Sequence, residues 1–492
     1  MSEQPPPPTR SIPLSSAHRW RAFGICVTVA AVTILDLSKI NVALPSIEEA
    51  LGASSTALQL LVAGYVLTFG LALVPAGRIG DQRSRRTLFI IGLSLFTLMS
   101  LLCGIAPNSE FLLVARLLQG VAAGIQMPQV IGLIQELFPA PRERGRAFGA
   151  FGAIIGVAVA FGPTVGGLLI AVGGPEHGWR WTFWMNVPLC LIALVLVIWM
   201  LPTTRRPSAA KLALDPIGIV LFGLATLALM WPFLFTTGSA DDDPNRWWLL
   251  VVAAVFTAAF IAWERHYEAS GKEPLIALGL FRIPSYRNGT LLMTAYFAAS
   301  PPMFLLANLF LQTGAGFAAV FAGMVTIGFA LSSALTSWLS GLWLQRFGQS
   351  MVVWGTVVVL VGVGALAAAA LFVPVEAVGW VMAAIMLLAG FGAGFIISPN
   401  QALTLMEVPV KQGGLAGSVG QLGQRVGTSI GTAVALSMFY STIRGEESGQ
   451  PHYTVYQDAY AHGMLAVALL LGVALIVGVI DLGSQRRAAR AR

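Results

Sequence analysis

The sequence predicts an all-α integral membrane protein whose chain spans the bilayer fourteen times. Of its 492 residues, 56% are hydrophobic and only 10% are charged, whereas a soluble domain usually carries about a quarter charged residues. The mean hydropathy is +0.78, and apolar runs of about 20 residues, enough for a helix to cross a bilayer, recur from end to end. The runs are long and do not alternate, which argues against a membrane β-barrel.

The apolar runs and the charges between them predict the topology. The expected spans are 21–45, 57–77, 87–106, 110–133, 146–172, 183–201, 214–235, 248–264, 289–312, 318–343, 350–372, 376–400, 413–442 and 459–482. An even number of spans puts both termini on one side. Of the 29 Lys and Arg residues, 23 fall in the tails and even-numbered loops and three in odd-numbered loops. The positive-inside rule therefore places both termini in the cytoplasm of a bacterial-type plasma membrane.

Two internal echoes predict a duplicated architecture. The segment "GVAAGIQMP" resembles "GFGAGFIISP" 270 positions later, and "GRIGDQRS" resembles "GLWLQRFG" 264 positions later. Nearly equal offsets indicate two six-helix halves with two extra helices inserted between them. The predicted regions are a disordered cytoplasmic tail (1–20), an N-terminal six-helix bundle (21–201), a linker with two extra transmembrane helices (202–288), a C-terminal six-helix bundle (289–482) and a cytoplasmic tail (483–492).

Composition and motifs argue against several other function classes. The net charge of +7 could suit nucleic acid, but the basic residues lie in short loops where topology explains them, so no nucleic-acid partner is expected. Cys26, Cys103 and Cys190 lie within apolar runs, and the five histidines are scattered, so we expect no disulfide framework, metal site or cofactor. The sequence contains no nucleotide-binding P-loop, which favours the proton-motive force as the energy source.

The segment "GRIGDQRSRR" joins the second and third spans and resembles the signature loop of the major facilitator superfamily, G-x-x-x-D-x-x-G-R-[RK]. The matching residues are Gly77, Asp81, Arg85 and Arg86, while Ser84 replaces the family's second glycine. The span that starts near Gly413 begins on the same face of the membrane as Asp81. An acidic side chain there would interact favourably with the positive N-terminal end of that helix. The resemblance implies that Asp81 and nearby arginines such as Arg144 form a cytoplasmic latch between the halves, as alternating access requires.

Further segments resemble other motifs of this superfamily. The segment "RLLQG" (116–120) is similar to its fourth-helix motif R-x-x-Q-G, and "GPTVGG" (162–167) is similar to the fifth-helix motif of its antiporter branches. Three segments resemble the fourteen-helix drug:proton antiporter branch: "LDLSKINVALP", "WRWTFWMNVP" (179–188) and "GQRVGTSIG" (423–431), the last with Arg and Gln exchanged relative to the family. In "GPTVGG", Gly162 and Gly166 form a small-residue face, and Pro163 permits a kink. The resemblance implies that this helix, with Gly167, lies at the interface between the halves and limits leakage; plain tight packing is the alternative.

Polar residues at helical spacing mark candidate surfaces of a substrate cavity. In the fourth span Arg116, Gln119 and Gln126 share one face, as do Gln421, Gln424 and Arg425 in the thirteenth. Such stripes avoid lipid and face either a partner helix or a water-filled cavity. For the amides, hydrogen bonding between helices is the alternative. The candidate cavity residues are Asn41, Gln119, Gln126, Asn308, Gln312, Asn400, Gln421, Gln424 and Arg425.

Asp36 and Lys39 place two opposite charges inside the first span. They are three residues apart and therefore neighbours on one helix face. A lone carboxylate in a membrane cavity tends to take up a proton because burial disfavours its charged form, but Lys39, where the family usually has an apolar residue, opposes this. Either the two form a structural ion pair of little net value, or substrate and proton compete for Asp36. We assign Asp36, Lys39 and Arg116 to proton coupling.

The resemblance and the residues together predict a proton-coupled exporter of lipophilic or amphipathic small molecules that acts by alternating access. Its expected partners are a small-molecule substrate, protons and the lipid bilayer, and the expected oligomeric state is a monomer. Lys39 and Arg425 leave open an anionic or lipid-like substrate. A membrane-embedded enzyme or a non-transporting scaffold is the alternative of another class, although no catalytic cluster is visible. The direction of transport is not encoded in any motif.

Overall fold

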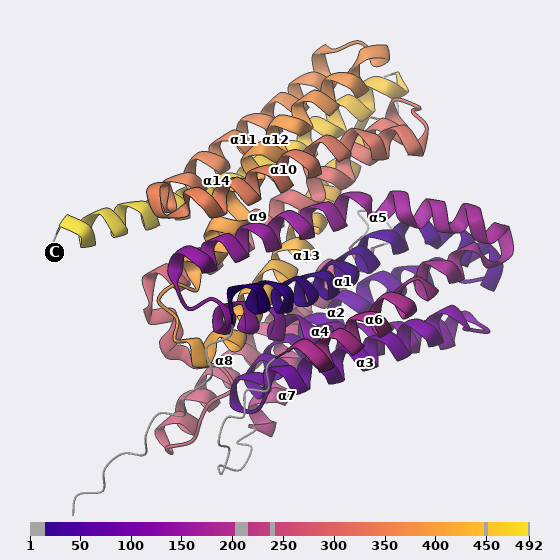
Figure 1. The fold of residues 1–492 in the computed structure, drawn as a ribbon. Helices are drawn as coiled ribbons and strands as arrows, with labels where there is room; N and C mark the ends of the chain where they lie inside the picture. Colours follow the sequence, from indigo (N-terminus) through magenta and orange to yellow (C-terminus); the bar gives the residue numbers. More distant parts are fainter. Residues whose placement is uncertain (1–14, 202–214, 237–241, 447–450, 491–492) are drawn as a thin grey trace, which may run out of the picture.

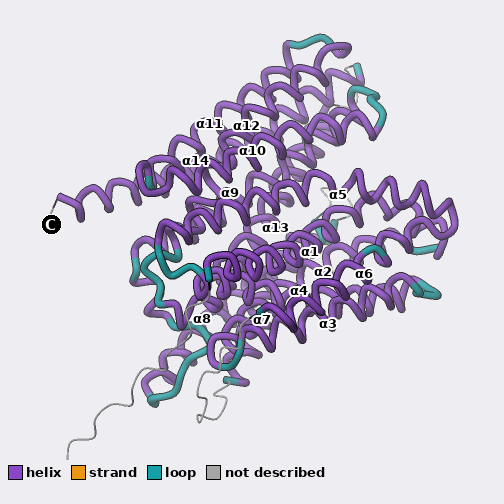
Figure 2. Tube along the Cα trace, in the orientation of Figure 1, coloured by secondary structure: helices purple, strands orange, loops and turns teal. Residues whose placement is uncertain are grey.

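The protein is all-helical in the computed structural model, which describes residues 15–201, 215–236, 242–446 and 451–490 (Figures 1 and 2). The first six long helices are α1 (Ser16–Leu51), α2 (Ser55–Gln82), α3 (Arg85–Gly104), α4 (Ser109–Leu137), α5 (Pro141–Trp184) and α6 (Asn186–Met200). Because α1 begins at Ser16, the last five residues of the predicted disordered tail are helical; residues 1–14 lie outside the described part.

The remaining helices follow in two groups. The inserted helices are α7 (Pro216–Leu234) and α8 (Leu249–Ala269). The last six are α9 (Pro284–Leu309), α10 (Ala319–Phe347), α11 (Gln349–Phe372), α12 (Val375–Thr404), α13 (Gly413–Glu446) and α14 (His452–Arg490). Short helical segments are η1 (Pro244–Trp248), η2 (Leu278–Arg282), η3 (Phe310–Gly314) and η4 (Val410–Gln412).

Helices that are long and apolar enough to span a membrane make up most of the described residues. Within the described ranges, 13 helices are long and apolar enough to cross a membrane, or 14 when the bent pair Pro141–Val159 and Phe161–Gly174 is counted as one span. This confirms the predicted fold class. The boundary between the fifth and sixth spans differs from the prediction, because helical backbone continues to Trp184 with a break at Gly174, where φ is 76°.

The helices pack as two bundles joined by one interface. Helices α1 to α6 contact one another, and so do α9 to α14, while α7 packs on α8. Contacts between the bundles are made by α5 with α10 and α12, and by α13 with α2 and α4. In Figure 1, α1 to α6 occupy the lower part, α9 to α12 and α14 the upper part, and α5 runs along the boundary.

Short polar residues start several of these helices. The side chain of Asn108 accepts a hydrogen bond from Phe111 N at 2.8 Å, and that of Asp215 accepts one from Gly218 N at 2.9 Å. Ser84, which replaces the family's glycine, caps α3 by accepting a hydrogen bond from Thr87 N at 3.3 Å. A side-chain oxygen at this position satisfies one of the free N–H groups of the first turn. The α2–α3 turn is therefore fixed by a cap instead of a glycine.

Glycines bring the two bundles into backbone contact near the start of α5. A Cβ atom added at Gly149 would lie 2.9 Å from the Cα of Gly341 in α10, and one added at Gly341 would lie 2.8 Å from the carbonyl oxygen of Gly145. A Cβ atom added at Gly156, further along α5, would lie 3.9 Å from the nearest α10 atoms. Small residues allow such close helix packing where lipid supplies no hydrophobic driving force. This end of the interface is therefore closed.

Candidate functional site

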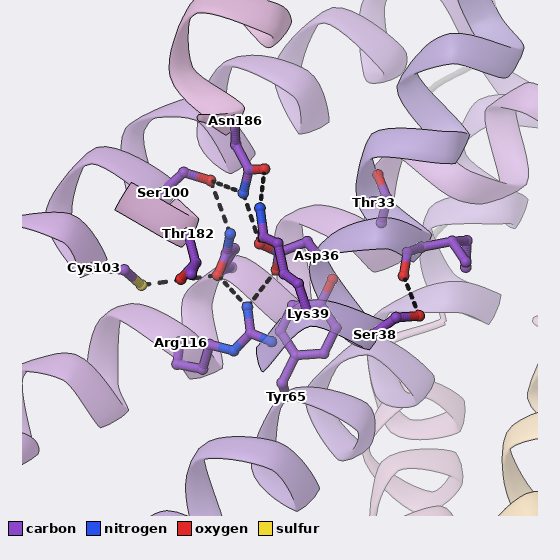
Figure 3. A network of polar contacts seen from close by, with 12 residues as sticks. Thr33, Asp36, Ser38, Lys39, Tyr65, Ser100, Cys103, Arg116, Thr182 and Asn186 are labelled. Atoms are coloured by element: carbon purple, nitrogen blue, oxygen red, sulfur yellow. Dashed lines mark hydrogen bonds and ion pairs between the residues drawn. The ribbon is translucent and has the colours of Figure 1, made fainter. Parts of the chain in front are cut away.

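A buried carboxylate lies at the centre of the N-terminal bundle (Figure 3). Asp36 of α1 is 0% exposed. Its Oδ2 atom accepts a hydrogen bond from Nη1 of Arg116 on α4, and its Oδ1 atom accepts one from Nδ2 of Asn186, at the start of α6, at 2.7 Å. Both Asp36 oxygens are thus engaged by donors from other helices.

Lys39 completes the group from the same helix. Its Nζ atom lies 3.4 Å from Asp36 Oδ1 and donates a hydrogen bond to Asn186 Oδ1 at 2.6 Å. The Lys39 side chain is 1% exposed. The Asn186 amide therefore has a fixed orientation, because its NH₂ group faces the carboxylate and its oxygen faces the ammonium. We name Asp36, Lys39, Arg116 and Asn186 the charged cluster.

Neighbouring side chains extend the charged cluster to two more helices. Gln119 accepts a hydrogen bond from Arg116 Nη1 at 2.7 Å and donates one to Ser100 Oγ of α3 at 2.8 Å. The Arg116 guanidinium also lies over the ring of Tyr65 on α2, 4.1 Å from its centroid, an arrangement that stabilises a cation. Five helices of the N-terminal bundle, α1, α2, α3, α4 and α6, therefore surround one carboxylate.

The charged cluster carries more positive than negative charge. It contains the Asp36 carboxylate and two cations, Lys39 and Arg116, all at most 1% exposed. Burying a charge is costly unless it is paired and hydrogen-bonded. Asp36 pairs with Arg116 through Nη1, whereas the buried Nε and Nη2 atoms of Arg116 have no hydrogen-bond partner among the described residues. Lys39 lies 3.4 Å from Asp36 and has a neutral amide as its nearest partner. One carboxylate is therefore shared by two cations, and the charged cluster has one positive charge in excess.

The fifth-helix motif packs directly on this part of α1. A Cβ atom added at Gly162 would lie 2.4 Å from Ser38 Cβ, and one added at Gly166 would lie 3.0 Å from the Lys39 carbonyl oxygen. Gly167 is less crowded, with Val42 Cγ1 4.0 Å away. The 40° bend between the two segments of α5 lies just before Pro163, which cannot donate a hydrogen bond to the carbonyl four residues earlier.

Gly162→Ala is expected to lower the melting temperature of the purified protein and to slow transport. The added methyl group must push α5 away from Ser38, and overpacking of this kind costs about 1–3 kcal/mol. Gly167→Ala is the matched control, because its methyl group meets only an ordinary contact with Val42. Thermal unfolding in detergent compares the two variants, and equal melting temperatures would show that α5 does not press on α1 at Gly162.

A second polar site joins the bundles where α2 meets α3. Asp81 accepts hydrogen bonds from the backbone N–H groups of Gly414 (3.1 Å) and Leu415 (2.8 Å) at the start of α13. Arg85 donates to Asp81 Oδ1 at 2.7 Å and to the Val410 carbonyl oxygen at 2.6 Å. A carboxylate at a helix N-terminus is stabilised by the free N–H groups and the helix dipole. We name these contacts between Asp81, Arg85 and residues 410–415 the Asp81 latch.

The other residues expected at this site have separate environments. A Cβ atom at Gly77 would lie 2.6 Å from Ser418 Oγ, so this glycine lets α2 and α13 cross closely. Arg86 donates a hydrogen bond to the Ile198 carbonyl oxygen and thus joins α3 to α6 within one bundle. Arg144 is buried near the start of α5. Gly77 therefore supports the Asp81 latch, while Arg86 makes its Ile198 contact inside the N-terminal bundle.

The amides proposed for a substrate cavity divide into three groups. Gln119, Gln126 and Asn400 are fully buried; Gln126 donates to Thr33 Oγ1 at 2.6 Å, and Asn400 donates to the Gly289 carbonyl oxygen at 2.9 Å. They join helices within a bundle. Asn41 and Gln312 are exposed. Residues with intermediate or slight exposure on α9 and α13 are Asn308, Gln421, Gln424 and Arg425.

Sequence reasoning did not identify three residues that surround Asp36. Asn186 bridges Asp36 and Lys39, Ser100 accepts from Asn186 and Gln119, and Tyr65 lies under Arg116. A signal existed for Asn186, since it belongs to the segment "WRWTFWMNVP". Ser100 and Tyr65 lie in ordinary apolar runs, where no spacing distinguishes them.

Comparisons with known proteins agree with this architecture. The chain is 32% identical over 443 residues to the probable actinorhodin transporter of Streptomyces coelicolor, covering 89% of this chain and 75% of that protein. It is 30% identical over 489 residues to the puromycin resistance protein pur8 of Streptomyces alboniger, covering 96% and 94%. It is also 29% identical over 408 residues to the multidrug resistance protein Stp of Mycobacterium tuberculosis, covering 81% and 72%.

Solved structures share the fold. The proton:xylose symporter XylE superimposes with a TM-score of 0.62 at 16% identity, covering 95% of each chain. The human organic anion transporter MFSD10 gives a TM-score of 0.62 at 14% identity, covering 93% of this chain and 99% of that one. A sequence model described as Major Facilitator Superfamily matches residues 26–432. The resemblance noted in the sequence is thereby confirmed, and this chain belongs to the Major Facilitator Superfamily.

Proposed function

We propose that this protein exports lipophilic or amphipathic small molecules in exchange for protons, by alternating access across a bacterial-type cytoplasmic membrane. Relatives described as an actinorhodin transporter and a puromycin resistance protein support the export of antibiotic-like compounds. The distribution of Lys and Arg supports cytoplasmic termini. The proposal includes a monomer with bundles at 21–201 and 289–482 and the inserted helices within 202–288.

The observation that carries the proposal is the charged cluster. Three ionisable side chains, Asp36, Lys39 and Arg116, lie inside the N-terminal bundle with at most 1% exposure. Ionisable groups at membrane depth are costly, and they mark ion and proton pathways in transporters. The charged cluster borders α5, which also contacts α10 of the other bundle through Gly149 and Gly341. A change in the protonation of the charged cluster can therefore alter the contact between α5 and α10 at the interface between the bundles.

The contacts between the bundles support an alternating-access cycle. The Asp81 latch and the glycine contacts of α5 with α10 lie at the same end, which the proposed topology makes cytoplasmic. The structure then corresponds to a state closed toward the cytoplasm. Substrate loading requires these contacts to break, and release on the other side requires them to re-form.

Purified protein in liposomes tests this function. With an acidic lumen, proton efflux should drive ethidium into the vesicles. One-to-one exchange would support about a tenfold accumulation ratio per pH unit of gradient, because a tenfold ratio and one pH unit both correspond to about 1.4 kcal/mol. Nigericin, which collapses the gradient, should release the dye. Accumulation equal to that of protein-free vesicles, or accumulation that survives nigericin, would refute proton-coupled export of this probe.

Arg425 favours a second candidate class of substrate, amphipathic anions. Its guanidinium lies 4.8 Å from the centroid of the Phe69 ring on α2, across the interface between the bundles. Its buried Nε atom has no hydrogen-bond partner, and no carboxylate of the described residues pairs with it. An anion bound nearby would stabilise a proton on the charged cluster, and the two would move together. Carboxyfluorescein in the same vesicles should then move with the protons instead of against them.

A further inference from the structure

We infer that Lys39, and not Asp36, is the group that binds and releases the transported proton. This inference rests on the proposed proton-coupled export and adds the identity of the exchanging group. Arg116 is excluded because a guanidinium is not deprotonated in proteins. The choice is then between protonating Asp36 and deprotonating Lys39, and the contacts of the charged cluster decide between them (Figure 3).

The charge balance of the charged cluster separates the two choices. With Asp36 ionised and Lys39 protonated, its charge is +1, because Arg116 supplies a second cation. Protonating Asp36 would leave two buried cations without an anion, the most costly arrangement. Deprotonating Lys39 leaves the Asp36–Arg116 ion pair intact and brings the net charge to zero. Burial disfavours the charged forms of Lys39 and Asp36 alike, so the charge balance is the effect that selects Lys39.

The hydrogen bonds around Lys39 are compatible with both its protonated ammonium form and its neutral amine form. A neutral amine still carries N–H groups and can keep donating to Asn186 Oδ1, now at 2.6 Å. Protonation of Asp36 would instead turn one of its oxygens into a donor, although both already accept from Arg116 and Asn186. Such a clash leaves buried donors without acceptors, at about 1–3 kcal/mol each. The hydrogen-bond geometry therefore accommodates deprotonation of Lys39 and opposes protonation of Asp36.

Titratable groups from three helices face the Lys39 side chain. Among the described residues, the titratable groups that face Lys39 are Asp36 on α1, Arg116 on α4 and the thiol of Cys190 on α6. Helix α5 contributes the backbone of Gly166, whose added Cβ would lie 3.1 Å from Lys39 Cβ. Helix α5 therefore packs against the backbone and Cβ of Lys39, at the base of its side chain.

The sign of the coupling follows from the same charges. A lipophilic cation entering near the charged cluster is repelled when Lys39 is protonated and accepted when it is neutral. Substrate and proton then exclude one another, which is the requirement for antiport. For one proton competing with one ligand, affinity falls about tenfold per pH unit below the pKa of the proton site. This slope is the quantity that the variants should change.

Binding of tetraphenylphosphonium, a cation that does not titrate, tests the inference in purified detergent-solubilised protein. Wild-type affinity should weaken as the pH falls, and binding should release protons into weakly buffered solution. Lys39→Arg holds the charge of the charged cluster at +1, so its binding should be weak at every pH. Lys39→Met holds it at zero, so its binding should be tight at every pH. In both variants, the number of protons released on probe binding should be about tenfold or more lower than in the wild type.

The outcomes separate the inference from the function on which it rests. If both variants keep the wild-type slope and proton release, the proton resides elsewhere and the assignment to Lys39 fails, while proton coupling stands. If wild-type protein does not bind the probe, or binds it with no pH dependence, the proposed exchange of cations for protons fails as well. Melting temperatures of the two variants show whether each is folded, and because one is predicted weak and the other tight, a shared folding defect cannot imitate the result.

Discussion

Asp36→Asn is expected to abolish proton-driven transport and to destabilise the protein. The substitution removes the only carboxylate of the charged cluster and leaves Arg116, which is 0% exposed, without its counter-ion. Breaking a buried ion pair by removing one partner costs about 3–5 kcal/mol. The nitrogen of the new amide would also face the donors of Arg116 or Asn186, because both oxygens of Asp36 accept hydrogen bonds. Thermal unfolding in detergent and dye accumulation in liposomes measure the two effects.

A second substitution separates stability from coupling. In the Asp36→Asn/Arg116→Gln double variant, the uncompensated guanidinium is gone, so about half or more of the lost stability should return. Transport should not return, since Lys39 would have lost the fixed anion that sets its proton affinity. Asp36→Asn protein that retains both wild-type stability and gradient-driven accumulation would contradict the assignment of Asp36 to this site.

Asp81→Asn is expected to slow turnover strongly while leaving substrate affinity within about threefold of wild type. The substitution removes the ion pair with Arg85 and the charge at the N-terminus of α13. Charged hydrogen bonds of this kind contribute about 1.5–3 kcal/mol each, so a loss of 3 kcal/mol would shift the balance between closed and open states by about 150-fold. The closed end would then open too readily, and the step that closes it would limit the cycle.

Cysteine labelling can observe this shift directly. Ser337 of α10 is 1% exposed and its carbonyl oxygen would lie 2.9 Å from a Cβ at Gly149, at the contact between α5 and α10. A Ser337→Cys reporter should react slowly with a membrane-impermeant maleimide in the parent protein and faster when Asp81→Asn is added. Glu110→Gln, at an exposed acid in the first turn of α4, is the control. A large loss of affinity with unchanged turnover and labelling would rule out the latch role.

Several features were accessible from the sequence because they depend on local pattern. Runs of about 20 apolar residues must form helices in lipid, since backbone N–H and C=O groups have no other partners there. The "GRIGDQRSRR" segment and the start of the span near Gly413 placed Asp81 beside a helix N-terminus, because both lie on one face of the membrane. Asp36 and Lys39 could be recognised as neighbours from their spacing of three.

The amides show where local pattern stops being sufficient. Gln119 and Gln126 share a helix face with Arg116, as their spacing requires, but a shared face does not reveal what it contacts. In the folded protein Gln119 binds Arg116 and Ser100, and Gln126 binds Thr33, inside one bundle. A polar stripe is equally compatible with a partner helix and a cavity, so only packing distinguishes them.

The sequence alone determined the membrane-spanning helices, the family and the presence of a charged pair in the first span. Tertiary structure alone decided which groups surround that pair, because Arg116 and Asn186 stand 80 and 150 positions from Asp36 and reach it only when α4 and α6 pack on α1. Electrostatic energy at a buried site depends on every charge within a few ångströms, and those distances are fixed by packing between helices and not by spacing along one of them.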